Sequence, residues 1–156
     1  MIRKIFNCLY EAISTAVILI GVMFAVLYAC GIRPYQVKSG SMGDLLPVGC
    51  VCFVSIYSDY DLIEIGDVIS FRVSEDMLVT HRVVNITDEG VFTRGDSNVN
   101  GDPDPVTKEN YIGKTVFALP YIGYMLEELH TRRGMIAVMT GIVLLVIAGM
   151  IYRRTR

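Results

Sequence analysis

Two long stretches without a charged residue frame the chain. Residues 12–32 form one run of 21 uncharged residues, and residues 134–152 form another of 19. Each is close to the roughly 20 apolar residues that cross a hydrocarbon core about 30 Å thick. We therefore predict transmembrane helices at 12–32 and 134–152. The first run exceeds the apolar core of about 7–15 residues found in cleaved targeting segments, which favours its retention as an anchor.

Between the two runs the pattern changes to that of β-strands. Alternating, β-branched and aromatic positions predict strands at 35–38, 48–57, 67–73 and 77–86. Turns rich in glycine, proline and aspartate separate these strands. Residues 116–122 then lead into a short amphipathic segment at 124–130. The predicted fold is mainly β, a small β domain flanked by two transmembrane α-helices.

Charge follows the same division of the chain. Residues 34–131 contain 6 Lys/Arg against 15 Asp/Glu. The two ends of the chain carry basic residues: Arg3, Lys4, Arg153, Arg154 and Arg156. The positive-inside tendency then predicts cytoplasmic ends and an extracytoplasmic acidic domain, although Arg132 and Arg133 oppose this orientation. An acidic domain also argues against nucleic acid as a partner.

The expected organisation has five parts. They are a cytoplasmic N-terminus (1–11), a transmembrane helix (12–32), an extracytoplasmic domain (33–133), a second transmembrane helix (134–152) and a cytoplasmic tail (153–156).

The four cysteines lack the spacing of a disulfide framework or a metal site. Cys8 and Cys30 lie near opposite ends of the first apolar run, whereas Cys50 and Cys52 are two residues apart in a strand-like segment. Strand alternation puts the latter two on one face, where we expect them to be buried apolar side chains. No CxxC or HxxxH spacing occurs, so we expect no metal and no cofactor.

Ser41 is the first candidate for chemistry. It stands in Ser39-Gly40-Ser41-Met42, shortly after the first apolar run, and Gly40 lets the backbone present its amides. In an extended segment Ser39 directs its hydroxyl to the same side as Ser41, so one hydroxyl could attack while the other donates to an oxyanion. The competing interpretation is a flexible Ser/Gly linker leaving a membrane helix.

His81 is one of two histidines and lies in an otherwise apolar strand segment, 78–84. A single histidine in a strand is more often a packed residue than a catalytic one, but an imidazole can accept a proton near neutral pH. A lysine base would need a strongly lowered pKa to do the same. We therefore favour His81 as the base and expect His130, beside Arg132, to lie at the membrane interface.

Three carboxylates follow in a loop rich in glycine, asparagine and proline: Asp96, Asp102 and Asp104. Most acidic residues in such loops only cap turns. A serine–histidine pair nevertheless needs one carboxylate to orient and stabilise the imidazolium. Composition and spacing do not choose among the three.

Taken in order, these segments resemble type I signal peptidase, specifically the archaeal and endoplasmic-reticulum branch of peptidase family S26 that uses histidine in place of lysine. Four boxes carry the resemblance: Ser39-Gly40-Ser41-Met42, Gly66-Asp67-Val68-Ile69-Ser70-Phe71, Thr80-His81-Arg82-Val83 and Arg94-Gly95-Asp96-Ser97-Asn98. The match covers roughly residues 37–106. Each box is weak alone, but four in the right order are a strong signal.

The resemblance implies a role for each candidate residue. Ser41 would be the nucleophile and His81 the general base, with the Ser39 hydroxyl and the Ser41 amide as the oxyanion hole. Asp102, six residues after Asp96, would be the acid of the triad, with Asp104 as a competitor. Asp96 would be needed structurally or electrostatically.

One position departs from the family pattern. The family usually continues after the nucleophile as Met-Glu-Pro or Met-x-Pro, whereas this chain has Met42-Gly43-Asp44. The missing proline predicts a more mobile Ser41 turn or an altered specificity.

The implied function is that of a membrane-bound serine endopeptidase of the cell membrane, with two spans and an extracytoplasmic catalytic domain. It would remove signal peptides with small residues at the cleavage site from secretory preproteins. The lipid bilayer and the protein translocation machinery are the other expected partners. Seven residues separate Ile32 from Gly40, which at about 3.3 Å each keeps Ser41 within roughly 25 Å of the membrane.

Two other interpretations remain at this stage. A non-catalytic membrane assembly or scaffold protein explains the spans but leaves the ordered Ser, His and Asp boxes to coincidence. A self-cleaving serine peptidase of the related repressor type is soluble and uses lysine, so the two spans and His81 count against it.

Overall fold

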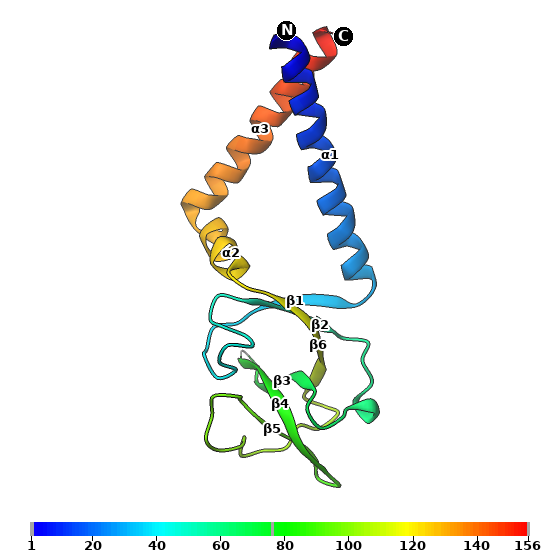
Figure 1. Cartoon of the computed structure of the whole chain (residues 1–156), viewed down its shortest axis with the longest axis vertical. Helices are drawn as coiled ribbons and strands as arrows, with labels where there is room; N and C mark the ends of the chain where they lie inside the picture. Colours follow the sequence, from blue (N-terminus) through cyan, green and yellow to red (C-terminus); the bar gives the residue numbers. More distant parts are fainter. Residues whose placement is uncertain (1, 76, 156) are drawn as a thin grey trace. The chain divides into compact units, whose positions relative to one another are not determined.

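The computed structural model describes residues 2–75 and 77–155. Its elements (Figure 1) are α1 (Ile2–Ala29), β1 (Ile32–Gln36), β2 (Val51–Ser55), the 3-10 turn η1 (Tyr60–Leu62), β3 (Val68–Ser74), β4 (Met77–Thr87), β5 (Gly90–Arg94), β6 (Tyr111–Leu119), α2 (Ile122–His130) and α3 (Arg132–Thr155). They form two units, Met1–Val26 with Met125–Arg156, and Leu27–Tyr124.

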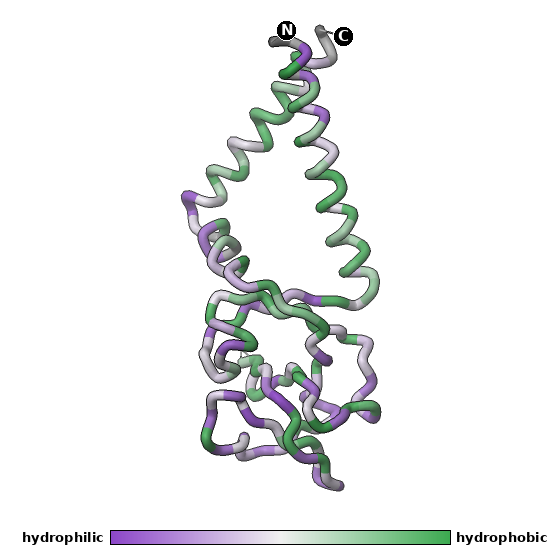
Figure 2. Tube along the Cα trace, viewed as in Figure 1, coloured by the Kyte–Doolittle hydropathy of each residue, from purple (hydrophilic) through white to green (hydrophobic). Residues whose placement is uncertain are grey.

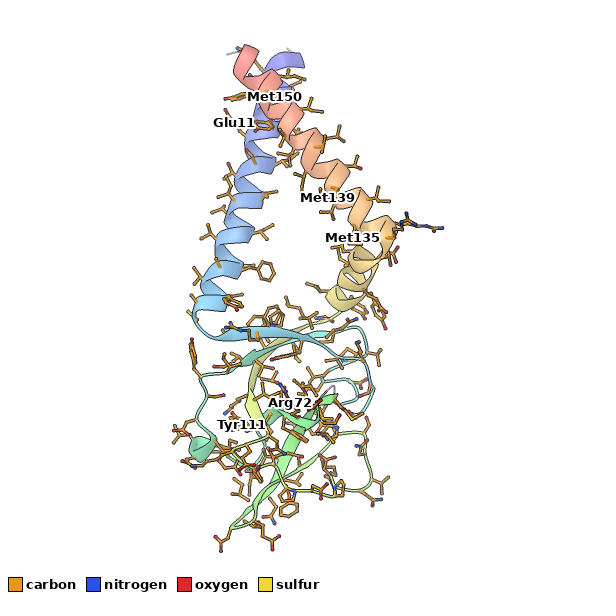
Figure 3. All side chains as sticks on the ribbon, turned by 180° about the vertical axis from the view of Figure 1, so that it is seen from behind. Glu11, Arg72, Tyr111, Met135, Met139 and Met150 are labelled. Atoms are coloured by element: carbon orange, nitrogen blue, oxygen red, sulfur yellow. The ribbon has the colours of Figure 1, made fainter. Side chains whose placement is uncertain are left out.

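The first unit contains the two long apolar helices. Segments Asn7–Ala29 and Arg132–Tyr152 have mean hydropathies of 2.4 and 2.5, and each is long and apolar enough to cross a membrane. Figure 2 shows this apolar character along both helices. Glu11, labelled on α1 in Figure 3, accepts a hydrogen bond of 2.6 Å from the Tyr152 hydroxyl of α3. Two membrane-compatible helices were predicted, and this feature of the fold is confirmed.

The first helix ends earlier than the uncharged run that predicted it. Gly31 has a φ of 75°, a left-handed conformation that glycine adopts at the ends of helices. The ring of Tyr57 occupies the space that a side chain at Gly31 would fill. Ile32, the last residue of the run, therefore begins β1 and not a further helical turn.

The second unit is built on one antiparallel sheet with the strand order β1-β2-β6-β3-β4-β5. The predicted strands at 67–73 and 77–86 match β3 and β4 within one residue at each end. The strand predicted at 35–38 instead runs over Ile32–Gln36. The short β5 was not predicted, because its five residues follow directly on a turn and the last of them, Arg94, opens the Arg94-Gly95-Asp96-Ser97-Asn98 box. The prediction of a mainly β domain is confirmed.

Two clusters of buried apolar side chains hold the sheet. The first joins β3, β4 and β5 and contains Ile63, Ile69, Phe71, Val83, Val91 and Val106. The second lies around β2 and the Ser41 turn and contains Met42, Leu46, Cys50, Cys52 and Val54. Cys50 and Cys52 are each 1% exposed, as predicted for buried apolar side chains. Met42 of the second cluster directly follows Ser41, and Val83 of the first lies two residues after His81.

Candidate active site

Strand β4 holds His81 on a buried face of the sheet. His81 is paired with Ile69 of β3, and alternation puts it on the same face as the buried Val83. The ring of Phe71 meets the imidazole edge to face, with centroids 6.3 Å apart. His81 itself is 6% exposed, so its polar ring atoms need partners within the protein.

Both ring nitrogens of His81 have such partners. Nδ1 lies 2.7 Å from Oδ2 of Asp102, and Nε2 lies 3.0 Å from Oγ of Ser41. An ionised carboxylate can only accept, so the hydrogen of a neutral imidazole is on Nδ1 and Nε2 is left as the acceptor. The Ser41 hydroxyl then donates to Nε2. This is the arrangement in which a histidine can take the proton of a serine as that serine attacks an electrophile.

The Ser41 turn is fixed by backbone contacts. The Gly43 N–H donates to the Gly40 carbonyl at 3.0 Å, and the Ser97 N–H donates to the Ser41 carbonyl at 2.8 Å. Met42 is 2% exposed and anchors the turn in the second apolar cluster. Gly43 has a φ of 55°, and a side chain there would come within 2.7 Å of Ser97 Oγ. Glycine fits this turn without displacing the Ser97 hydroxyl or straining a backbone with a positive φ.

Ser39 lies beside the Ser41 hydroxyl. The two Oγ atoms are 3.2 Å apart. Since the Ser41 hydrogen is directed to His81, the Ser39 hydroxyl is the donor of this pair. Ser39 is exposed, and its donor therefore stands at the surface next to the oxygen that would react.

Asp102, and not Asp104, is the loop carboxylate that meets His81. The Asp102 N–H donates to the Thr93 carbonyl at 2.8 Å, and the Thr93 hydroxyl donates to Asp102 Oδ2 at 2.5 Å. Val106, further along, makes an antiparallel bridge with Val91. The returning loop is thus held against β5 at two points. Asp104, which lies between them, is exposed.

Asp96 faces a different partner. Its two carboxylate oxygens accept from Arg82 Nε at 2.8 Å and Nη2 at 2.7 Å, and Arg82 Nη1 also donates to the Gly66 carbonyl. The hydrogen bond from Arg82 is the main cause that lowers the pKa of the Asp96 carboxyl below its ordinary value. Because Arg82 follows His81 in β4, this bidentate pair ties the loop to the strand that carries the imidazole.

A groove of about 470 Å³ passes Ser41 and His81. One wall is formed by residues 35–38, where β1 ends, and the other by residues 77–80 of β4. Three strands separate β1 from β4 in the sheet order, so the sheet must curve for both to line one groove. Apolar side chains such as Val37, Met42 and Leu46 line it.

Cys52 also lines this groove but is poorly suited to react. Burial raises the pKa of its thiol to about 11, so the thiolate is scarce at neutral pH. Among residues 2–75 and 77–155, no group of three or more His, Cys, Asp and Glu side chains could hold a metal ion. The side chain of His130, expected at the membrane interface, lies outside the described part of the structure.

Sequence reasoning missed the residues that contact the candidates. Thr93 gave only the weak signal of a polar residue in a short apolar stretch, and its contact to Asp102 depends on the return of the loop. Arg82 was within a recognised box, but its pairing with Asp96 is not encoded by spacing. The close approach of Ser97 to the Ser41 turn likewise depends on the tertiary fold.

Comparisons with known proteins place the chain in a family. The family model described as "Signal peptidase, peptidase S26" matches residues 9–120. Signal peptidase I W of Bacillus subtilis (strain 168) is 35% identical over 130 residues, covering 76% of this chain and 68% of that protein. The signal peptidase complex catalytic subunit SEC11 of Fusarium vanettenii is 29% identical over 118 residues, covering 68% of this chain and 69% of that protein. The resemblance expected from the four boxes is thereby confirmed, and the chain belongs to the signal peptidase family, peptidase S26.

Proposed function

We propose that Ser41, His81 and Asp102 form the catalytic triad with which this membrane serine endopeptidase removes N-terminal signal peptides from secretory preproteins. One observation carries the proposal: an unbroken chain of hydrogen bonds joins the Ser41 hydroxyl, both nitrogens of the buried imidazole and the Asp102 carboxylate. Membership of the signal peptidase family supplies the reaction, and the hydrogen-bond chain supports the assignment of residues to it.

The triad performs acylation first. The proton of the Ser41 hydroxyl moves to His81 Nε2 while Oγ bonds to the carbonyl carbon of the scissile peptide, whose π electrons move to the carbonyl oxygen. When that oxygen re-forms the carbonyl, the C–N bond breaks and the leaving amine takes the proton from Nε2. Asp102 stabilises the imidazolium that exists between these events and keeps its hydrogen on Nδ1.

Hydrolysis of the ester repeats the same transfers with water. A water molecule gives one proton to His81 Nε2 as its oxygen attacks the ester carbon. Collapse breaks the bond to Ser41 Oγ, which recovers the proton from Nε2. The signal peptide leaves with a free carboxyl group, and the enzyme returns to its starting state.

The developing oxyanion needs donors at the surface of the site. The Ser39 hydroxyl already donates to the Ser41 oxygen, so a small rotation redirects it to a carbonyl oxygen bound to that atom. We assign the Ser39 hydroxyl and the Ser41 backbone amide as the two donors. Such donors act most strongly in the transition state, because charge develops there.

The groove suits an extended chain with small side chains. β1 is an edge strand. Residues 77–80 of β4 are paired with β3 on one side only, because the pairing of β4 with β5 begins at Arg82, so their main-chain groups that face away from β3 are available along the groove. An extended preprotein segment can therefore add to a strand edge, with its side chains in the shallow apolar space beside Ser41. This supports a preference for small residues at the cleavage site.

The membrane helices place the enzyme in the same membrane as its substrate. We propose that both spans lie in the cell membrane, with the ends cytoplasmic and residues 33–133 extracytoplasmic. The enzyme and the apolar helix of a preprotein then share one bilayer, which raises their effective concentration. Because two relatives are named as catalytic subunits of a complex, we also propose that this chain works beside the protein translocation machinery.

The alternatives are not favoured by these findings. A scaffold would not need a serine, an imidazole and a carboxylate joined by hydrogen bonds of 3.0 Å or less. A lysine-dependent peptidase of the repressor type would need a lysine where His81 contacts Ser41.

Substitution of the serines tests the catalytic assignment. Ser41→Ala should abolish preprotein cleavage, because the attacking atom is removed, while membrane insertion continues. Ser39→Ala should lower turnover by about 100- to 1000-fold, as expected for one oxyanion donor. Cleavage of a native preprotein by purified variants measures both effects. Wild-type turnover by Ser41→Ala would show that another group is the nucleophile.

The two loop aspartates should differ sharply. Asp102→Asn should reduce turnover by several orders of magnitude, because an amide supports the wrong imidazole tautomer. Asp104→Asn, at an exposed position two residues away, is the matched control and should remain near wild type. Turnover of both variants on one preprotein is the measurement. A larger loss in Asp104→Asn than in Asp102→Asn would show that Asp104 is the acid of the triad.

The ion pair between Arg82 and Asp96 should stabilise the fold near neutral pH and lose this effect in acid. The pKa of Asp96 is lowered in the folded protein, so the pair stabilises the fold above the unfolded carboxyl pKa of about 3.9 and loses this effect as pH falls further. Asp96→Asn should lower the melting temperature at pH 7 and approach wild type below about pH 4. Melting curves from pH 7 to 3, with Asp104→Asn as control, measure this. If the difference in melting temperature between Asp96→Asn and wild type stays constant over this pH range, the ion pair is not its cause.

Orientation can be tested in spheroplasts carrying tags at both ends of the chain. Added protease should cut within residues 33–133 and spare both tags, because the basic ends hold them inside. A cytoplasmic marker protein checks that the membrane is intact, and detergent should expose the tags. A protected central domain with a cleaved C-terminal tag would reverse the proposed orientation.

A further inference from the structure

Thr93 is a buried polar residue whose hydroxyl contacts the proposed triad. It is 0% exposed, and its Oγ1 donates to Asp102 Oδ2 at 2.5 Å. Its carbonyl also accepts the Asp102 N–H at 2.8 Å. Thr93 therefore contacts both the backbone N–H and the carboxylate of Asp102. No bound substrate can touch Thr93, because it has no accessible surface.

The sheet register explains how Thr93 reaches this position. Thr93 of β5 is paired with Val83 of β4, and residues paired across strands point to the same face. Val83 lies two residues after His81 and hence on the same face as the imidazole. The Thr93 hydroxyl therefore emerges on the side of the sheet where Asp102 meets His81.

The hydrogen bond from Thr93 is made to the same Asp102 oxygen that accepts from His81. Oδ2 of Asp102 accepts from both the Thr93 hydroxyl and His81 Nδ1. A carboxylate on its own can turn about its terminal bond, since torsions of this type have broad minima. Two donors that converge on one oxygen remove that freedom and keep Oδ2 aimed at Nδ1. The hydroxyl thereby acts on the geometry of the imidazole without contacting it.

We propose that Thr93 is a positioning residue for catalysis, whose hydroxyl holds the Asp102 carboxylate in the orientation that stabilises the His81 imidazolium. This proposal rests on the proposed triad. The competing explanation is that the hydroxyl merely satisfies its own hydrogen-bonding need within the core. That explanation predicts a change in stability, whereas the positioning role predicts a change in turnover that depends on Asp102.

The first test compares variants with and without the hydroxyl. Thr93→Val keeps the shape and removes the donor, and it should lower kcat by about 10- to 100-fold, the loss expected for one hydrogen bond to a charged group. KM should change little, because Thr93 does not reach the groove. Thr93→Ser keeps the donor and should stay within a few-fold of wild type. If Thr93→Val does not fold, Thr93→Ala and Thr93→Ser give the same comparison, since they differ only in the hydroxyl.

The deciding test is a double-mutant cycle in the full-length enzyme in detergent, with single-turnover cleavage of a preprotein as the readout. In an Asp102→Ala background, removal of the Thr93 hydroxyl should cost less than about two-fold, because the group it positions is gone. An equal loss in both backgrounds, or unchanged kcat in Thr93→Val, overturns the positioning role while the triad stands. Wild-type turnover by Asp102→Ala itself would instead remove the triad acid, and this proposal with it.

Discussion

The arrangement of the site depends on the register of β4 within the sheet. His81 is paired with Ile69, and this pairing turns the imidazole inward toward Ser41 and Asp102. Because side chains alternate along a strand, a slip by one residue would turn His81 to the opposite face and bring Arg82 inward. Val83 opposes such a slip, because it would leave the buried apolar cluster that it shares with Ile69 and Phe71 of β3 and turn to the opposite face. The apolar packing of the sheet therefore fixes the direction of a polar group.

The loop between β5 and β6 connects the remaining parts of the site. Its residue Ser97 donates to the Ser41 carbonyl, Asp96 pairs with Arg82, and Asp102 bonds to His81 and Thr93. One segment thus contacts the turn that carries the nucleophile, the strand that carries the base and the strand beside it. The mutual position of serine, histidine and aspartate depends on this loop as much as on the sheet. This explains why the Arg94-Gly95-Asp96-Ser97-Asn98 box, in which Asp96 and Ser97 make two of these contacts, belongs to the recognisable pattern of the family.

Periodicity and local chemistry were sufficient to predict the two apolar helices, strands β3 and β4, and the candidates Ser41 and His81. These features depend on residues that are close together in the sequence. The choice between Asp102 and Asp104 could not be made in that way, because it depends on the hydrogen bond from Asp102 to the Thr93 carbonyl. The end of α1 was misjudged for a similar reason. The helix ends because Gly31 adopts a left-handed conformation against the ring of Tyr57, and hydropathy carries no information about that contact.

Gly43 limits how parts of this enzyme can be exchanged with those of its relatives. A side chain at this position would meet Ser97, which lies on a different loop, and would strain a backbone with a positive φ. The nucleophile turn and the Ser97 loop therefore form a matched pair and not two independent modules. A chimera that imports a nucleophile turn with a larger residue at this position would fit best with the partner loop from the same donor. Along the lineage, changes at these two positions would be expected to occur together.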